Sequence, residues 1–133
     1  MYGELANYGE INALNAVFRT EDLYMGLATA PINDDDDIGD IEEVTDSNYS
    51  RIAISFDLPF QEGGMGTIKN EMTGNFGPWS ADQPETITHI FITTVGEGTA
   101  GELVAYAELP SPKEPEVDEL IILGEEDFTI RID

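Results

Sequence analysis

The chain has 133 residues, 41% of them hydrophobic, which is the size and composition of one folded domain. Its 28 acidic residues against 5 basic ones give a formal net charge of -23 at pH 7, which argues against nucleic acid as a partner, because such binding depends largely on basic side chains. The absence of cysteine excludes disulfides and thiolate zinc sites, and no apolar run reaches the about 18 residues of a membrane span, so no membrane contact is expected.

The first predicted element is an amphipathic α-helix over residues 5–19. Apolar residues recur there at steps of three and four, which places them on one stripe of a helix. The stripe consists of Leu5, Tyr8, Ile11, Leu14 and Phe18. Asn7 and Glu10 have the spacing of a capping box, which would begin the helix at Asn7.

After Thr20 the spacing changes to that of a β-strand. In "DLYMGLAT" (22–29) the large apolar residues alternate with smaller or more polar ones, and Pro31 ends the run. The alternating set is Leu23, Met25 and Leu27. A strand is therefore predicted here, as the start of a β-domain over about residues 22–133.

An acidic segment follows, "NDDDDIGDIEEVTD" (33–46), with eight carboxylates and no basic residue. A calcium loop is one interpretation, because hard cations require several converging oxygen ligands. Asp34 and Asp36 could fill the first two positions of an EF-hand loop, but the third position falls on Ile38 and no helix flanks the segment. The spacing favours a solvated, mobile loop, with a weak or interface-shared cation site, between Asp34 and Asp40, as the alternative.

The clearest strand pattern lies in "SRIAISFDL" (50–58), which Pro59 ends. The apolar face would carry Ile52, Ile54, Phe56 and Leu58, and the polar face Arg51, Ala53, Ser55 and Asp57. The following "EGGMG" (62–66) has the composition of a flexible turn, and "TIKNEMT" (67–73) that of a short strand.

Residues 74–85, "GNFGPWSADQPE", are predicted to form a loop broken by glycine and proline. Trp79 in this loop has two interpretations. It could be an exposed platform on which a sugar ring stacks, or an apolar plug over an open end of the core. The plug is favoured, because no companion aromatic residue accompanies this single tryptophan.

His89, the only histidine, lies in "ETITHIFITTV" (85–95), where both faces are substantially apolar, as in a central strand. One face would carry Ile87, His89, Phe91 and Val95, and the other Ile90 and Ile92. A metal site would need further ligands, and a general base would need a nucleophile and an orienting group. His89 is therefore interpreted as a structural strand residue, and no catalytic, metal-binding or cofactor-binding residue is expected in the chain.

The remaining segments predict further strands. "GEGTAG" (96–101) is a hairpin turn, "ELVAYAEL" (102–109) a strand, "PSPKEPEVDE" (110–119) a proline-stiffened connection and "LIIL" (120–123) a short strand. In the last strand, "FTIRID" (128–133), Phe128, Ile130 and Ile132 would point inward, and Thr129, Arg131 and Asp133 outward. Short strands separated by glycine and proline turns predict a mainly β fold: one domain, residues 1–133, with an antiparallel β-sandwich or β-barrel-like architecture and one N-terminal α-helix.

The order of these segments resembles that of a family of small structural proteins of tailed bacteriophages, usually labelled tail-fibre proteins. The similarity covers nearly the whole chain, and its most specific part is Trp79, "TITHIFI" and "LVAYAELPSPK" in that order. "LYMGLATA", "YSRIAISF" and the closing "DFTIRID" also match. In that family the pair corresponding to Thr88 and His89 belongs to a strand.

The resemblance implies a non-enzymatic virion protein, without cofactors, that serves as an accessory tail component: a fibre, a fibre adaptor or a baseplate part. A capsid decoration protein on the phage head is an alternative, because both roles need a compact domain that docks on a larger lattice. A glycan-binding β-sandwich module that uses Trp79 is a second alternative. The implied partners are other virion proteins, from tail or capsid, and further copies of the chain within the particle.

Overall fold

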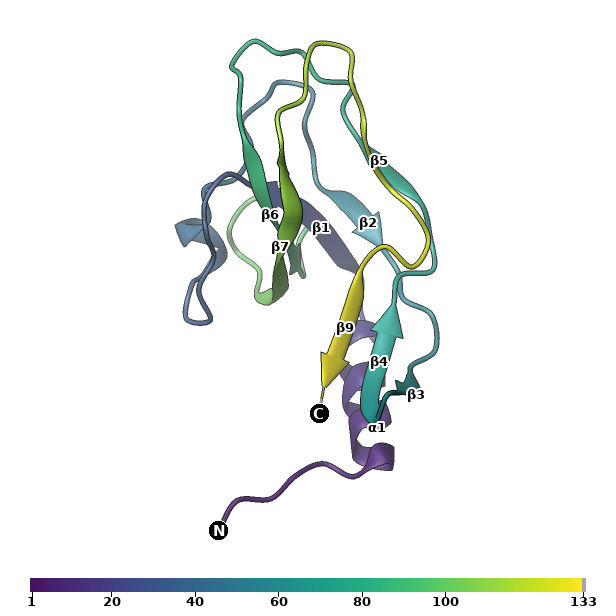
Figure 1. Ribbon diagram of the computed structural model, residues 1–133. Coiled ribbons are helices and arrows are strands. Elements are labelled where there is room, and N and C mark those ends of the chain that lie inside the picture. Colours follow the sequence, from purple (N-terminus) through teal and green to yellow (C-terminus); the bar gives the residue numbers. More distant parts are fainter. Residues whose placement is uncertain (133) are drawn as a thin grey trace.

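The computed structural model describes residues 1–132 and shows a mainly β fold with an N-terminal helix (Figure 1). The helices are α1 (Asn7–Phe18) and the short 3-10 helix η1 (Ile38–Asp40). The strands are β1 (Leu23–Ala28), β2 (Ile52–Ile54), β3 (Phe60–Glu62), β4 (Met65–Lys69), β5 (Gly74–Phe76), β6 (Ile87–Thr93), β7 (Leu103–Lys113), β8 (Ile121–Leu123) and β9 (Thr129–Ile132).

The strands form three antiparallel sheets, in the orders β2-β1-β6-β7, β3-β4-β9 and β5-β8. Across residues 1–132 none of these sheets closes into a barrel. The predicted fold class, a mainly β, sandwich-like architecture with one N-terminal helix, is confirmed.

Helix α1 lies against β4, and it buries Leu14 and Phe18 as predicted. The approach is close, because a Cβ at Gly66 of β4 would stand 2.7 Å from the Cβ of Glu10. Three details of the prediction are wrong. Leu5 lies before the helix and is 54% exposed, and Tyr8 is 79% exposed. The helix begins at Asn7, but it has Ala6 at its N-cap, with no side-chain cap.

The capping box fails because Glu10 faces the sheet. Its carboxylate is buried and accepts a hydrogen bond of 2.9 Å from Gln61 Nε2, so it does not reach back to the start of the helix.

The strand predicted over 50–58 is shorter than its pattern suggests. Only Ile52–Ile54 pairs with β1. Beyond it the chain changes partner, because the amide of Asp57 donates to the carbonyl of Lys69 at 2.9 Å and Phe56 pairs with Asn70. Leu58 is consequently exposed, against the prediction, whereas Phe56 is buried.

Several other strands differ from the prediction. The turn at Gly63 and Gly64, both with positive φ, joins β4 to β3, a strand that the pattern missed. β5 lies in the stretch expected to be a loop, and it pairs with β8. β7 runs on through Pro110 and Pro112, which an edge strand accommodates because one side of its backbone needs no ladder partner.

The central strand β6 separates two apolar clusters. A register shift turns Ile87 toward Ile90 and Ile92 in the main core, against the prediction that it shares a face with His89 and Phe91. Phe91 lies in an outer cluster with Ala28 and Ile32. At the end of the chain Phe128 is buried, Ile130 and Ile132 pack on the main core and Arg131 is exposed, as predicted. Asp133 lies outside the described residues.

Candidate functional site

His89 lies in the middle of β6, as predicted, and is only 9% exposed. Its register partners are Ala28 on β1 and Glu108 on β7. Its Nδ1 stands 2.7 Å from Oγ1 of the adjacent Thr88. Within the described residues no third side chain hydrogen-bonds to the imidazole to orient it, so the pair does not have the geometry of a catalytic triad.

The acidic segment makes contacts that the sequence did not predict. It folds over the outer face of the four-stranded sheet: Ile38 is buried, to 3% exposure, and Ile41 packs against the outer cluster of Ala28, Ile32 and Phe91. The amide of Thr29 donates to the carbonyl of Glu42 at 2.9 Å, and that of Val44 to Leu27 at 3.1 Å. The segment is therefore held against the sheet at Ile38 and Ile41, and its mobility stays a prediction.

The aspartates themselves are mostly solvated, as expected. Asp37 and Asp40 cap η1 reciprocally, Asp36 accepts the amide of Asn33 at 2.8 Å, and Asp34 accepts the hydroxyl of Tyr106. That last bond is the main reason why the pKa of Tyr106 is raised. Across residues 1–132 no group of three or more acidic or imidazole side chains is arranged to hold a metal ion.

Arg51 is the clearest case of a residue whose burial the alternation pattern did not predict. It was predicted on the polar face, but its side chain is 4% exposed. Its guanidinium binds the carboxylate of Glu43 through two bonds of 2.8 and 2.9 Å, donates to the carbonyl of Val95 and lies 5.4 Å from the centre of the Phe91 ring. The Glu43 hydrogen bond is the main reason why the pKa of Arg51 is raised.

Two further residues fit this cluster closely. Tyr49 donates its hydroxyl to Glu43 at 2.5 Å and accepts the amide of Leu27 at 3.0 Å. Burial, followed by the bond to Glu43, raises the pKa of the Tyr49 hydroxyl. A Cβ at Gly26 would lie 2.3 Å from the Phe91 ring, so only glycine allows this ring to cross β1. This cluster holds the acidic segment against the sheet, because Glu43 of the segment binds both Arg51 and Tyr49.

Trp79 is buried, with 1% exposure. Its amide donates to the carbonyl of Glu119, and its carbonyl accepts the amide of Asp118, each at 2.8 Å. The ring packs against Tyr49, with the ring centres 6.4 Å apart. The interpretation as a sugar platform is wrong, and that as an apolar plug is confirmed, because this loop is tied down over the core.

Asp46 was not singled out by its sequence context, yet its buried carboxylate organises the loop that holds Trp79. It accepts hydrogen bonds from the hydroxyl and amide of Ser80, at 2.7 and 3.1 Å, and from the amides of Ala81 and Asn48, both at 3.0 Å. Burial alone raises the pKa of Asp46, but these bonds outweigh it and hold the pKa below its ordinary value.

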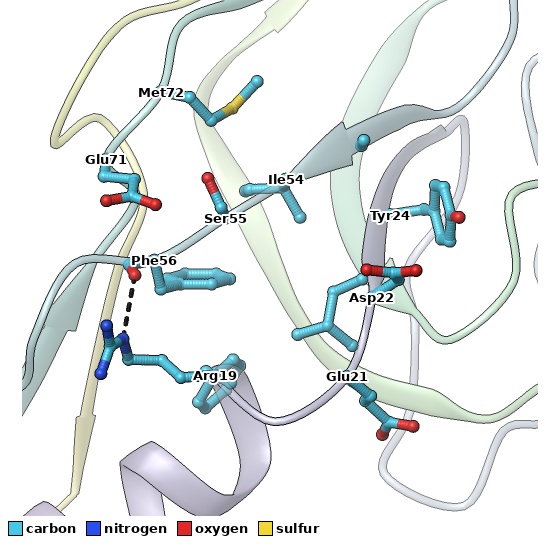
Figure 2. Close-up of a pocket in the computed structure, with 12 residues that line it drawn as sticks. Arg19, Glu21, Asp22, Tyr24, Ile54, Ser55, Phe56, Glu71 and Met72 are labelled. Atoms are coloured by element: carbon cyan, nitrogen blue, oxygen red, sulfur yellow. Dashed lines mark hydrogen bonds between the residues drawn. The ribbon is translucent and has the colours of Figure 1, made fainter.

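A pocket of about 540 Å³ opens between the end of α1, the start of β1 and the chain around β2. Its lining mixes apolar and polar side chains, and three carboxylates stand around it (Figure 2). They belong to Glu21, Asp22 and Glu71, while Arg19 donates through Nε to the carbonyl of Phe56 at 3.2 Å. The carboxylates at its edge could receive a cationic side chain.

A family model described as Podophage GP4 fiber I protein gp80 matches residues 4–131. No curated protein matches the chain. Among the described residues, no helix has the length and apolar character needed to cross a bilayer.

Proposed function

The chain belongs to the Podophage GP4 fiber I protein gp80 family, and from this membership we propose that it is a non-enzymatic accessory component of a phage tail, in the fibre itself, its adaptor or the baseplate. The family makes it a virion protein of the phage-fibre type. The single observation that carries the proposal is the extent of the match, residues 4–131, which takes in α1 and every strand except the end of β9.

The use of the polar side chains supports a structural role. The best-ordered carboxylates each bind groups that hold the fold together: Glu43 binds Arg51, Asp46 binds the Trp79 loop, and Glu85 accepts the amides of Thr45 and Asp46 at 3.0 Å. Groups committed in this way stabilise loops.

The proposed partners are other virion proteins together with further copies of this chain. The strongly negative charge favours partner surfaces that are basic or that meet the chain through its few uncharged areas. The carboxylate-rimmed pocket beside α1 would suit a lysine or arginine side chain from such a partner, with its stem on the apolar wall and its charge at the rim.

Immunogold electron microscopy of purified virions, with an antibody against this protein, tests the tail assignment. We expect label on the tail fibres or at the tail tip. Label over the head would overturn the tail role in favour of capsid decoration. Particles that carry no label, with the antibody shown to recognise the purified protein, would contradict a place in the mature virion.

A further inference from the structure

The N-terminal arm, residues 1–6, leaves α1 as an extended segment that points away from the sheets (Figure 1). Tyr2 and Leu5 on this arm are exposed, and so are Tyr8 at the start of α1 and Phe60 on the neighbouring strand β3. This end of the molecule carries six of the ten large hydrophobic side chains that are exposed in the described residues. Exposed apolar side chains gathered in one place mark an interaction surface.

The β7–β8 groove is a second apolar surface. It is a hollow of about 330 Å³ with Leu109, Pro110 and Ile122 along it, and Ile122 is 66% exposed. This volume is at the lower end of the range of about 300–1,000 Å³ for ligand pockets, and it would take one or two large side chains. The groove therefore suits an apolar peptide segment.

Two charged side chains line this groove, Lys113 and Asp127. Within residues 1–132 Lys113 is the one basic side chain with neither an ion pair nor a side-chain hydrogen bond, whereas Asp127 accepts the amide of Gly124 at 2.7 Å. The N-terminal arm carries one carboxylate, Glu4, between the large apolar side chains of Tyr2 and Leu5. The apolar side chains of the arm therefore match the apolar lining of the groove, and Glu4 offers a partner to the unpaired Lys113.

The two surfaces lie at opposite ends of the molecule. The arm leaves where α1 and β3 lie, whereas β8 pairs with β5 toward the other end (Figure 1). A contact between them consequently joins two molecules. Because the two surfaces differ, the contact is heterologous, and repetition of it generates either a closed ring or a linear array.

We propose that the N-terminal arm of one copy docks in the β7–β8 groove of a second copy, with Tyr2 and Leu5 on the apolar lining and Glu4 beside Lys113. The proposal rests on the proposed function in one respect, since a fibre component is present in several copies. Two chains that each carry a charge of -23 repel each other, so a contact that buries apolar side chains and pairs Glu4 with Lys113 limits this repulsion.

The test is size-exclusion chromatography with light scattering, over a range of protein concentrations, on the full chain and a set of exposed-site variants. We expect concentration-dependent oligomers of the unaltered protein. Y2S/L5S should raise the dissociation constant more than tenfold, because it removes the apolar contact. E4K and K113E should each raise it about fivefold, and the double variant E4K/K113E should restore it.

The matched control is E97K, at an exposed position in the turn between β6 and β7. It changes the net charge as E4K does, so it should leave the association unchanged or strengthen it slightly. A protein that stays monomeric at every concentration overturns the proposal. So does a double variant that associates no better than E4K alone, or an E97K variant that loses association as E4K does. These outcomes are independent of the immunogold result, so the two proposals can fail separately.

Discussion

At the scale of single residues, the fold depends on buried polar side chains that no sequence motif marks. Asn70 is fully buried; its Nδ2 donates to the carbonyls of Met72 and Gly124 at 2.9 and 2.8 Å, and its Oδ1 accepts the amide of Phe128 at 2.8 Å. These bonds join the end of β4 to the turn that precedes β9. Nothing in "TIKNEMT" separates this asparagine from any surface asparagine, because its partners are as many as 58 residues away.

We expect Asn70→Ala to lower the free energy of unfolding by about 3 kcal/mol, because it removes the partner of the Phe128 amide and of the Met72 carbonyl, and one of the two donors to the Gly124 carbonyl. Chemical denaturation followed by circular dichroism measures this change. Asn75→Ala, at an exposed position on β5, is the matched control and should have an effect below about 0.5 kcal/mol. Equal effects of the two substitutions would contradict the role given to Asn70.

Asp46 gives the protein a predictable response to acid. Its pKa in the folded state lies below the ordinary value of 3.8, so the native state releases this proton more readily than the unfolded chain does. The stabilisation is complete at neutral pH and is lost as the pH falls below about 3.8 through the folded-state pKa. Asp46→Asn should melt below the unaltered protein at pH 7, and the difference between their melting temperatures should narrow toward pH 3.

Thermal melts from pH 7 to pH 3 measure this narrowing. Asp35→Asn, at an exposed carboxylate of the acidic segment, is the control and should keep close to the unaltered protein throughout. A difference between Asp46→Asn and the unaltered protein that stays constant with pH would show that Asp46 does not act through its charge.

His89 is expected to contribute to stability alone. Its imidazole makes a hydrogen bond to the neighbouring Thr88 and is otherwise packed in β6, so His89→Gln should lower the free energy of unfolding by about 1 kcal/mol or less. Incorporation of the variant into virions, measured by immunoblot of purified particles, should be unchanged. A variant of normal stability that fails to assemble would assign His89 a role in contact with a partner.

At the scale of elements, the acidic segment shows how composition can mislead. Closely spaced carboxylates repel one another and favour an extended chain. The apolar residues among them nevertheless give the segment one face that can be buried against the sheet. Two carboxylates of the segment stabilise local structure: Glu43 pairs with Arg51, and Asp37 caps η1. The sequence contains these isoleucines, but periodicity could not show which surface they cover, since the segment has neither a helical nor a strand spacing.

We expect Ile38→Ala to lower the free energy of unfolding by about 2 kcal/mol, because Ile38 is buried to 3% exposure and its truncation leaves a cavity beneath the acidic segment. Ile122→Ala makes the same chemical change at an exposed position and should cost less than about 0.5 kcal/mol. Denaturant titration of both variants measures the difference. If Ile38→Ala is as mild as Ile122→Ala, the acidic segment does not pack on the sheet in solution.

Strands were predicted poorly where the pairing partner changes along the chain. β1 and β6 agree with their predicted positions, whereas the regular alternation over 50–58 forms a strand only at Ile52–Ile54, because the chain then pairs with Asn70 instead of β1. β3 and β5, of three residues each, exist through pairing with β4 and β8. Such short strands have almost no periodicity of their own, so sequence reasoning placed them in a turn and a loop.

At the scale of the whole molecule, we propose that the chain is one domain, because the main core joins α1 and all three sheets. Leu14 from the helix, Ile68 from β4 and Leu123 from β8 all belong to it. We therefore expect a single cooperative unfolding transition. Circular dichroism and the fluorescence of buried Trp79 should give coincident curves, and two separated transitions would show that the sheets unfold as independent units.

The sequence by itself determined the mainly β class, the N-terminal helix, the placement of β1 and β6, the structural position of His89 and the family resemblance. These depend on local spacing and on the linear order of segments. Only the tertiary structure decided that Trp79 is buried, that the Arg51 side chain is buried in an ion pair with Glu43 and that the acidic segment covers a sheet. Burial and pairing depend on which distant segments meet, and the free energy of those contacts outweighs local preference.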